Sequence, residues 1–211
     1  CALPICEMWF DLASLTKVIF TTQRILELVD EDLADLDAPL SHYIPDLRQY
    51  DMRAPERALT LRQCLAHQTH LPAVEPIYTI GHDPERLKAF VLQHVWDAGP
   101  PVYSDINFIL LGIAIERITG RPLREADLPS GLSFAPPHEY AVATEFCHWR
   151  NRVVIGDVHD ENAFALGGAA GHAGLFGTID GVLDYAHHLM NGGGLRSDIL
   201  NHIVKPQSET R

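Results

Sequence analysis

The segment at positions 104–119 constrains the fold of this chain more than any other stretch. Its sequence, SDINFILLGIAIERIT, is strongly apolar and is followed by Gly120. An apolar run of helical length that ends at a glycine predicts a helix, and Ser104 or Asp105 is expected to cap its start. Strand signals are sparse in the rest of the sequence, so local patterns predict a mainly helical domain.

A second helix is predicted over residues 14–29, SLTKVIFTTQRILELV, because its apolar residues form a broad face of the kind that is buried. Shorter helices are predicted at 60–65 and 179–190, where Thr60 and Thr178 are the expected caps, and at 85–96, where Pro84 marks the start. The stretch 121–165 is rich in proline and turn formers, which predicts irregular structure with short strands near Val142 and at 153–155. Residues 167–177, GGAAGHAGLFG, are expected to form a loop of small residues.

Ser14 and Lys17 lie at the start of the second predicted helix, in the run FDLASLTKV. Side chains three positions apart share one face of a helix. A serine hydroxyl is a poor nucleophile at neutral pH, but a lysine that has lost its proton can act as its base. The spacing therefore fits a nucleophile and its activator, and it equally fits a serine that starts a helix beside a solvated lysine.

The charge of the chain excludes some classes of partner. The formal net charge is −12 and the isoelectric point is near 5.3, which argues against nucleic acid or an anionic membrane surface. No apolar run reaches the length of a membrane span, and no signal peptide is recognisable; a periplasmic, secreted or cytoplasmic location stays open. The sequence contains neither Cys-x-x-Cys nor His-Glu-x-x-His, so no metal and no organic cofactor is implied.

Four segments, taken in order, resemble one superfamily. FDLASLTKV is similar to the Ser-x-x-Lys motif of the serine β-lactamases and penicillin-binding proteins. LTLRQCLAHQTHLPA, YSDINFILLGIAIERITG and GGAAGHAGLFGTIDGVLDYAHHLMNGG resemble later segments of its class C β-lactamase and esterase-like branch. The resemblance implies an α+β, β-lactamase/transpeptidase-like fold, of which this chain holds mainly the helical part with few or incomplete strands. We expect one such domain over residues 1–211, incomplete at both ends.

The resemblance also implies roles for individual residues. Ser14 is the expected acyl-accepting nucleophile, Lys17 its proton acceptor or a proton relay, and Tyr103 a second base. Asp105 stands where the family usually has asparagine, so it is a candidate substrate-binding residue that only accepts hydrogen bonds when ionised. His172 begins His172-Ala173-Gly174, which has the outline of the family's His-Thr-Gly motif, although the helix expected after it fits a Gly-rich turn instead. We therefore take Asp105 and His172 together as candidate substrate-binding residues.

Two functions follow from these expectations. The first is a serine hydrolase that forms an acyl-enzyme on Ser14 and hydrolyses a small ester, amide or β-lactam. The second is a catalytically inactive fragment or binding module that keeps the helical half of the fold. The sequence alone leaves the substrate, the oligomeric state and the choice between the two open.

Overall fold

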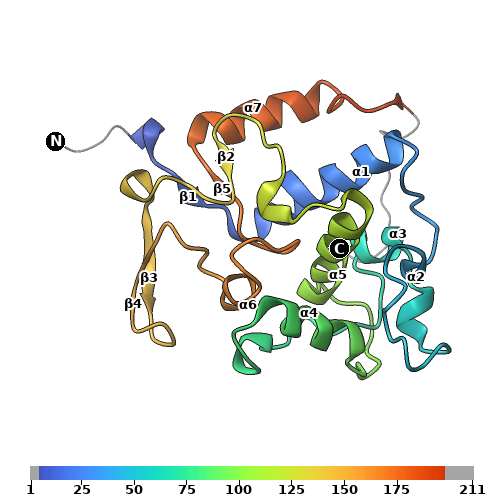
Figure 1. Ribbon diagram of the computed structural model, residues 1–211. Helices are drawn as coiled ribbons and strands as arrows, with labels where there is room; N and C mark the ends of the chain where they lie inside the picture. The colour runs from blue at the N-terminus through green and yellow to red at the C-terminus, as the bar shows by residue number, and fades with distance from the viewer. Residues whose placement is uncertain (1–4, 198–211) are drawn as a thin grey trace.

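Helix α5, Asp105–Thr119, lies at the centre of the computed structural model, which describes residues 5–197 (Figure 1). It contacts helices α1, α2, α3 and α4, and all its residues from Ile106 to Ile115 are buried. The Ser104 hydroxyl caps its start by accepting a hydrogen bond from the Asn107 N–H at 3.3 Å. Its last turn is followed by Gly120 in the left-handed region, at φ 67°. Both sequence predictions for this helix are therefore confirmed, and Ser104 rather than Asp105 is the capping residue.

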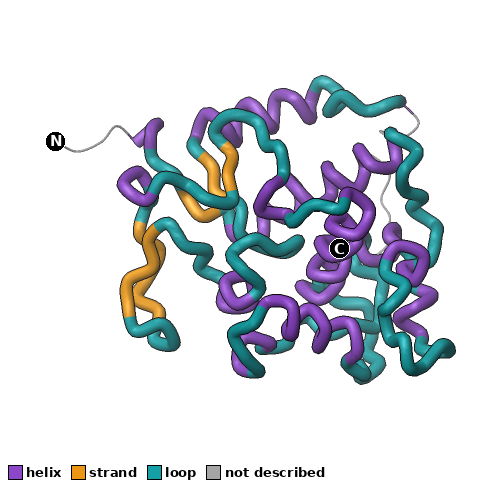
Figure 2. Tube along the Cα trace, viewed as in Figure 1, coloured by secondary structure: helices purple, strands orange, loops and turns teal. Residues whose placement is uncertain are grey.

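Short helices surround α5, joined by long loops, as the tube in Figure 2 shows. The α-helices are α1 (Gln23–Asp30), α2 (Leu40–Tyr43), α3 (Leu61–Leu65), α4 (Pro84–Gln93), α6 (Glu161–Ala165) and α7 (Ile179–Met190). Single 3₁₀ turns are η1 (Ile5–Glu7), η2 (Ala13–Leu15), η4 (Pro55–Ala58), η5 (Ile77–Thr79), η6 (Leu123–Glu125) and η7 (His138–Tyr140).

The helix boundaries mostly follow the capping residues. Thr60 forms a capping box with Gln63 at the start of α3, and Thr178 caps α7, as predicted. Helix α4 ends at Gln93, before the predicted end at Trp96, because the backbone becomes extended at His94. Trp96 is thereby placed in the hydrophobic core, where it is 6% exposed.

The helix that carries Ser14 has three successive geometries. Ser14 lies in the 3₁₀ turn η2, η3 (Lys17–Thr22) is a π-helix, and α1 continues to Asp30. The Thr22 hydroxyl donates to the Lys17 carbonyl at 2.7 Å, which satisfies one backbone group in the widened segment. Single π turns are rare and often occur at functional sites. The predicted helix over residues 14–29 is thus present, but it is not a uniform α-helix.

Two small sheets complete the described part. Strands β1 (Phe10–Asp11) and β2 (Leu132–Ser133) both pair antiparallel with β5 (Phe176–Gly177), in the order β1-β5-β2. Strands β3 (Ala143–Cys147) and β4 (Arg152–Ile155) form a separate hairpin at the edge of the molecule (Figure 1). The hairpin agrees with the strands predicted near Val142 and at 153–155. The three-stranded sheet was not predicted, because strands of two residues show no alternating pattern.

The loop of small residues, 167–177, packs directly on α5. Gly171 lies so close to this helix that a Cβ atom on it would be 2.0 Å from the Phe108 carbonyl oxygen. The Thr21 hydroxyl donates to the Gly171 carbonyl at 2.6 Å, so the loop is also attached to the helix of Ser14. Two glycines, Gly112 and Gly171, allow this approach of loop and helix. Within residues 5–197, no helix combines the length and apolar character needed to cross a bilayer.

Candidate active site

Ser14 lies on a tight turn that follows the first strand. Asp11 Oδ1 accepts a hydrogen bond from the Ala13 N–H at 2.8 Å, and the Leu12 N–H donates to the Leu175 carbonyl at 2.9 Å. Ala13 has a φ of 46°, a left-handed conformation that costs a residue with a Cβ about 1 kcal/mol or more. The turn leaves Ser14 and Leu15 exposed at the surface, while Thr16 and Lys17 are buried.

Lys17 is a buried cation with three partners around its ammonium group. Its Nζ donates to Ser14 Oγ at 2.9 Å and to the His172 carbonyl oxygen at 3.2 Å, and it lies 2.8 Å from Asp105 Oδ1. The contact with Asp105 is an ion pair rather than a well-directed hydrogen bond. An ammonium has three N–H donors and no acceptor, so the three partners match its capacity. With Lys17 only 2% exposed, the solvated-lysine interpretation is wrong.

The ring of Tyr103 covers Lys17 from the outside. Lys17 Nζ lies 4.9 Å from the centre of this ring, which is a cation–π contact, and the ring packs on His67 at 4.4 Å between centres. Tyr103 is 55% exposed, and its hydroxyl forms no hydrogen bond with residues of the described range. The structure therefore brings Tyr103 beside the pair through its ring face.

A loop before α4 holds the start of α5 in place. The Ser104 N–H donates to His67 Nδ1 at 2.9 Å, and the Ser104 hydroxyl donates to the Pro72 carbonyl at 2.6 Å. The Asp105 N–H donates to the Ala73 carbonyl at 2.8 Å. Burial lowers the pKa of His67, the charge of Lys17 lowers it further, and Asp105 partly opposes both. A neutral His67 that accepts at Nδ1 thus serves as a fixed support for the backbone between Tyr103 and Asp105.

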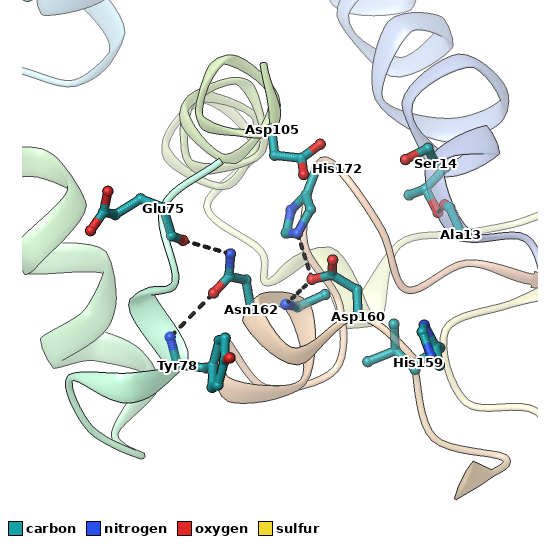
Figure 3. Close-up of polar contacts among 12 residues, drawn as sticks. Ala13, Ser14, Glu75, Tyr78, Asp105, His159, Asp160, Asn162 and His172 are labelled. Atoms are coloured by element: carbon teal, nitrogen blue, oxygen red, sulfur yellow. Dashed lines mark hydrogen bonds and ion pairs between the residues drawn. The ribbon is translucent and has the colours of Figure 1, made fainter. Parts of the chain in front are cut away.

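His172 and Asp160 form a second pair of titratable side chains beside the first. In Figure 3 the ring of His172 points toward Asp160, and its Nε2 lies 2.8 Å from Asp160 Oδ1. The same oxygen accepts the Ala163 N–H at 2.7 Å and so caps α6. Burial alone would raise the pKa of Asp160, but the hydrogen bond and charge of His172, the Ala163 N–H and Lys17 outweigh it and lower the pKa to about 2. Asp160 is therefore ionised at neutral pH.

The structure thus assembles the predicted residues unevenly. Ser14, Lys17 and Asp105 are in direct contact, and Tyr103 lies over them. The His172 backbone touches Lys17, while its side chain is 1% exposed and faces Asp160. The substrate-binding roles of Asp105 and His172 stay predictions.

The sequence did not predict Asp11 as part of this site, and it placed Asp160 only within a turn expected beside the cleft, without its partner His172. The run Val158-His159-Asp160-Glu161-Asn162 was visible as a polar turn, but its partners lie far away in the sequence. Asn162, for example, holds the Glu75 carbonyl at 2.8 Å and the Tyr78 N–H at 3.2 Å, which attaches another loop beside the site (Figure 3). Only a local signal existed, namely an aspartate three residues before Ala163 at the start of a short helix.

Two further features lie outside these contacts. A cavity of about 470 Å³ is lined by residues of η3, α1, the end of α5 and α7, and includes none of Ser14, Lys17 or Asp105. Among the residues that the structure describes, no group of three or more histidine, cysteine, aspartate or glutamate side chains is arranged to hold a metal ion.

Comparison with known proteins places this arrangement in a family. The beta-lactamase family model matches residues 7–126, the part of the chain that supplies Ser14, Lys17, Tyr103 and Asp105. The chain belongs to the beta-lactamase family. An N-acetylmuramyl-L-alanine amidase of Bacillus subtilis is 29% identical over 230 residues, covering 89% of this chain and 51% of the amidase. A putative D-alanyl-D-alanine carboxypeptidase of Escherichia coli is 30% identical over 225 residues, covering 88% of this chain and 51% of that protein.

Solved structures support the same fold. A class C beta-lactamase from Rhodobacter sphaeroides superposes with a TM-score of 0.66 and 19% identity, over 94% of this chain and 56% of that chain. The resemblance to the superfamily of serine β-lactamases and penicillin-binding proteins, and the β-lactamase/transpeptidase-like fold class, are therefore confirmed. The chain spans about half the length of the curated relatives that it matches. These relatives and this solved structure are named as an amidase, a putative D-alanyl-D-alanine carboxypeptidase and a class C beta lactamase.

Proposed function

We propose that the chain carries the nucleophile half of a serine hydrolase that forms an acyl-enzyme on Ser14. The observation that supports this most is the 2.9 Å contact between Lys17 Nζ and Ser14 Oγ, with the lysine buried and the serine exposed. A nucleophile has to reach substrate while its activator is kept from water, and this pair has that arrangement. Ser14 Oγ attacks the carbonyl carbon, the leaving group departs with a proton, and water then releases the acid.

Proton transfer depends on the surroundings of Lys17. In the arrangement described above its ammonium donates to Ser14 Oγ and the His172 carbonyl and forms an ion pair with Asp105, so Lys17 takes the Ser14 proton only after one of its own has left. Asp105, at 2.8 Å, is the group placed to receive that proton. We therefore favour a relay through Lys17 and Asp105 over a lysine that acts alone.

Tyr103 is the proposed second base. Its ring already lies against Lys17, and a rotation of this half-exposed side chain brings its hydroxyl toward the leaving group or the hydrolytic water. The backbone N–H of Ser14 is the proposed donor to the oxyanion, since it lies in the first turn of its helix.

Among ester, amide and β-lactam substrates, the relatives favour an amide. Both curated relatives are named for the cleavage of amide or peptide bonds. Because the chain spans about half of each, the full substrate site of the relatives includes parts that this chain does not match.

The test is covalent labelling with a fluorophosphonate and with penicillin, read by peptide mass spectrometry. We expect one adduct on Ser14, none in Ser14→Ala, and normal labelling in the control Ser41→Ala, a serine on α2. An adduct on another residue, or labelling that persists in Ser14→Ala, contradicts the proposal. A folded chain that no probe labels supports the inactive fragment or binding module instead.

A further inference from the structure

The peptide segment His159-Asp160 connects the two halves of the Ser14–Lys17 pair. On one side, the His159 N–H donates to Asp11 Oδ2 at 2.6 Å, and the other oxygen of Asp11 accepts the Ala13 N–H. On the other side, Asp160 Oδ1 binds His172 Nε2 at 2.8 Å. In Figure 3, His159 and Asp160 lie below His172, with Ala13 and Ser14 on the neighbouring helix.

The Ser14 side of this connection controls a strained turn. Asp11 fixes Ala13 in its left-handed conformation directly before Ser14. Because the second oxygen of the same carboxylate is bound to the His159 backbone, the turn is attached to residues 159 and 160 rather than free to relax.

The Lys17 side controls the position of one acceptor. The His172 carbonyl oxygen accepts a hydrogen bond from Lys17 Nζ, and the His172 ring is buried with its Nε2 directed at Asp160. The ring and the carbonyl belong to one buried residue, so a displacement of the ring that shifts the His172 Cα also shifts the carbonyl. The hydrogen bond to Asp160 thus restrains the direction of the oxygen that Lys17 uses.

We propose that Asp160 is a positioning residue for the reaction at Ser14. Its hydrogen bond with the His172 ring holds the His172 carbonyl within hydrogen-bond distance of Lys17 Nζ, and the backbone of the neighbouring His159 holds the turn before Ser14 through Asp11. The inference rests on the proposed serine hydrolase function. Asp160 touches neither substrate nor the reacting atoms. Its ionised carboxylate accepts a hydrogen bond from His172 Nε2, so Nε2 is the ring nitrogen that carries the proton.

A simple capping role does not account for this aspartate. Serine, threonine or asparagine would also cap α6, but His172 Nε2 needs an acceptor at this point because it is buried. Asp83 is a useful comparison, since it caps α4 through the Glu85 and Arg86 N–H groups on another part of the molecule. Asp83→Ala is therefore the matched control for loss of a cap.

The experiment measures the rate of Ser14 labelling by a fluorophosphonate in Asp160→Asn, Asp160→Ala, His172→Gln, His172→Ala and the Asp160→Ala/His172→Ala double variant. We expect labelling about tenfold to a hundredfold slower in each alanine variant, the range for a lost hydrogen bond to a charged group. The double variant should be no slower than either single variant, because both remove the same contact. Asparagine and glutamine keep an acceptor or a donor and should restore part of the rate.

Two readouts separate positioning from a general structural effect. The limiting rate at saturating probe should fall while the probe concentration for half-saturation stays within about twofold, since neither residue contacts the probe. Asp83→Ala should lower the melting temperature without slowing labelling. The proposal would be overturned if the double alanine variant were slowed by the product of the two single-variant factors. A loss of probe affinity with an unchanged limiting rate, or normal labelling in Asp160→Ala, would also overturn it.

A third readout does not depend on activity. Nitrogen-15 NMR of the wild-type chain should show the His172 proton on Nε2, and a crystal structure of Asp160→Ala should show the His172 carbonyl beyond 3.5 Å from Lys17 Nζ. If the wild-type chain is not labelled at all, the proposed function fails. These two measurements still show whether Asp160 holds the His172 carbonyl on Lys17 Nζ. A carbonyl that stays on Nζ in Asp160→Ala refutes it.

Discussion

The packing of Gly171 on α5 gives the sharpest test of how this site is held together. In Gly171→Ala the added Cβ would lie 2.0 Å from the Phe108 carbonyl oxygen, 2.9 Å from the Gly112 N and 3.0 Å from the Gly112 Cα. All three atoms belong to the backbone of a buried helix, so no side chain can turn away to make room. Loop and helix therefore have to separate by about 1.4 Å to reach an ordinary contact distance.

The cost follows from that separation. Overpacking a well-packed core costs about 1–3 kcal/mol, and a backbone clash of this severity belongs at the upper end, about 3 kcal/mol. For a chain of this size 1 kcal/mol corresponds to about 2–4 °C, so we expect a melting temperature about 6–12 °C lower. Because His172 follows Gly171 directly, the same shift should draw its carbonyl from Lys17 and slow Ser14 labelling.

The assay is urea and thermal unfolding followed by circular dichroism, with labelling measured in parallel. Gly112→Ala places a Cβ 2.8 Å from the Gly171 N, so it should also lower the melting temperature and slow Ser14 labelling. Gly81→Ala has no atom within 4 Å of the new Cβ and should leave stability unchanged or slightly higher. Gly171→Ala with a free energy of unfolding within about 0.5 kcal/mol of wild type would refute the reasoning.

Three further predictions concern single groups. The pKa of Asp160 is lowered to about 2 in the folded state, so its ionised form stabilises the folded chain. This stabilisation is fully present above the pKa that Asp160 has in the unfolded chain, and it is lost as the pH falls through the pKa of the folded state. The wild-type advantage over Asp160→Asn in urea unfolding should thus shrink from about 2 kcal/mol at pH 7 to about 1 kcal/mol at pH 3, and a constant difference would contradict it. Burial raises the pKa of Cys64 to about 12, so iodoacetamide at pH 8 should modify exposed Cys6 quickly and Cys64 only after unfolding, as peptide mass spectrometry will show. Ser104→Ala removes the cap of α5 and the bond to Pro72 and should cost about 1–2 kcal/mol in urea unfolding, whereas Ser41→Ala should cost less than about 0.5 kcal/mol.

Local sequence signals predicted the helical parts of this molecule well. Helix α5 has an apolar pattern, a serine cap and a terminal glycine, and each of these acts within a few residues of the helix itself. The pairing of Ser14 with Lys17 is equally local, because one helical turn brings the two side chains together.

The parts that were not predicted depend on partners far away in the sequence. Strand β1 has two residues and exists because β5, near the other end of the described chain, supplies its hydrogen bonds. Asp11 and His159 are 148 positions apart, and nothing near either residue indicates the other. The end of α4 was placed too late because Trp96 enters the core from an extended segment, an arrangement that apolar residues near a helix end do not distinguish from a further turn.

The contacts of Lys17 join three of the four segments that resemble the family. Ser14 Oγ comes from its own helix, Asp105 from the start of α5, and the His172 carbonyl from the small-residue loop. A buried ammonium that lacks one partner loses about 1–3 kcal/mol, so a Ser-x-x-Lys turn without the other two segments would keep its lysine in water. The tetrapeptide therefore becomes a nucleophile with a buried activator only where α5 and the loop pack against it, and the closeness of Gly171 to Gly112 is what permits that packing.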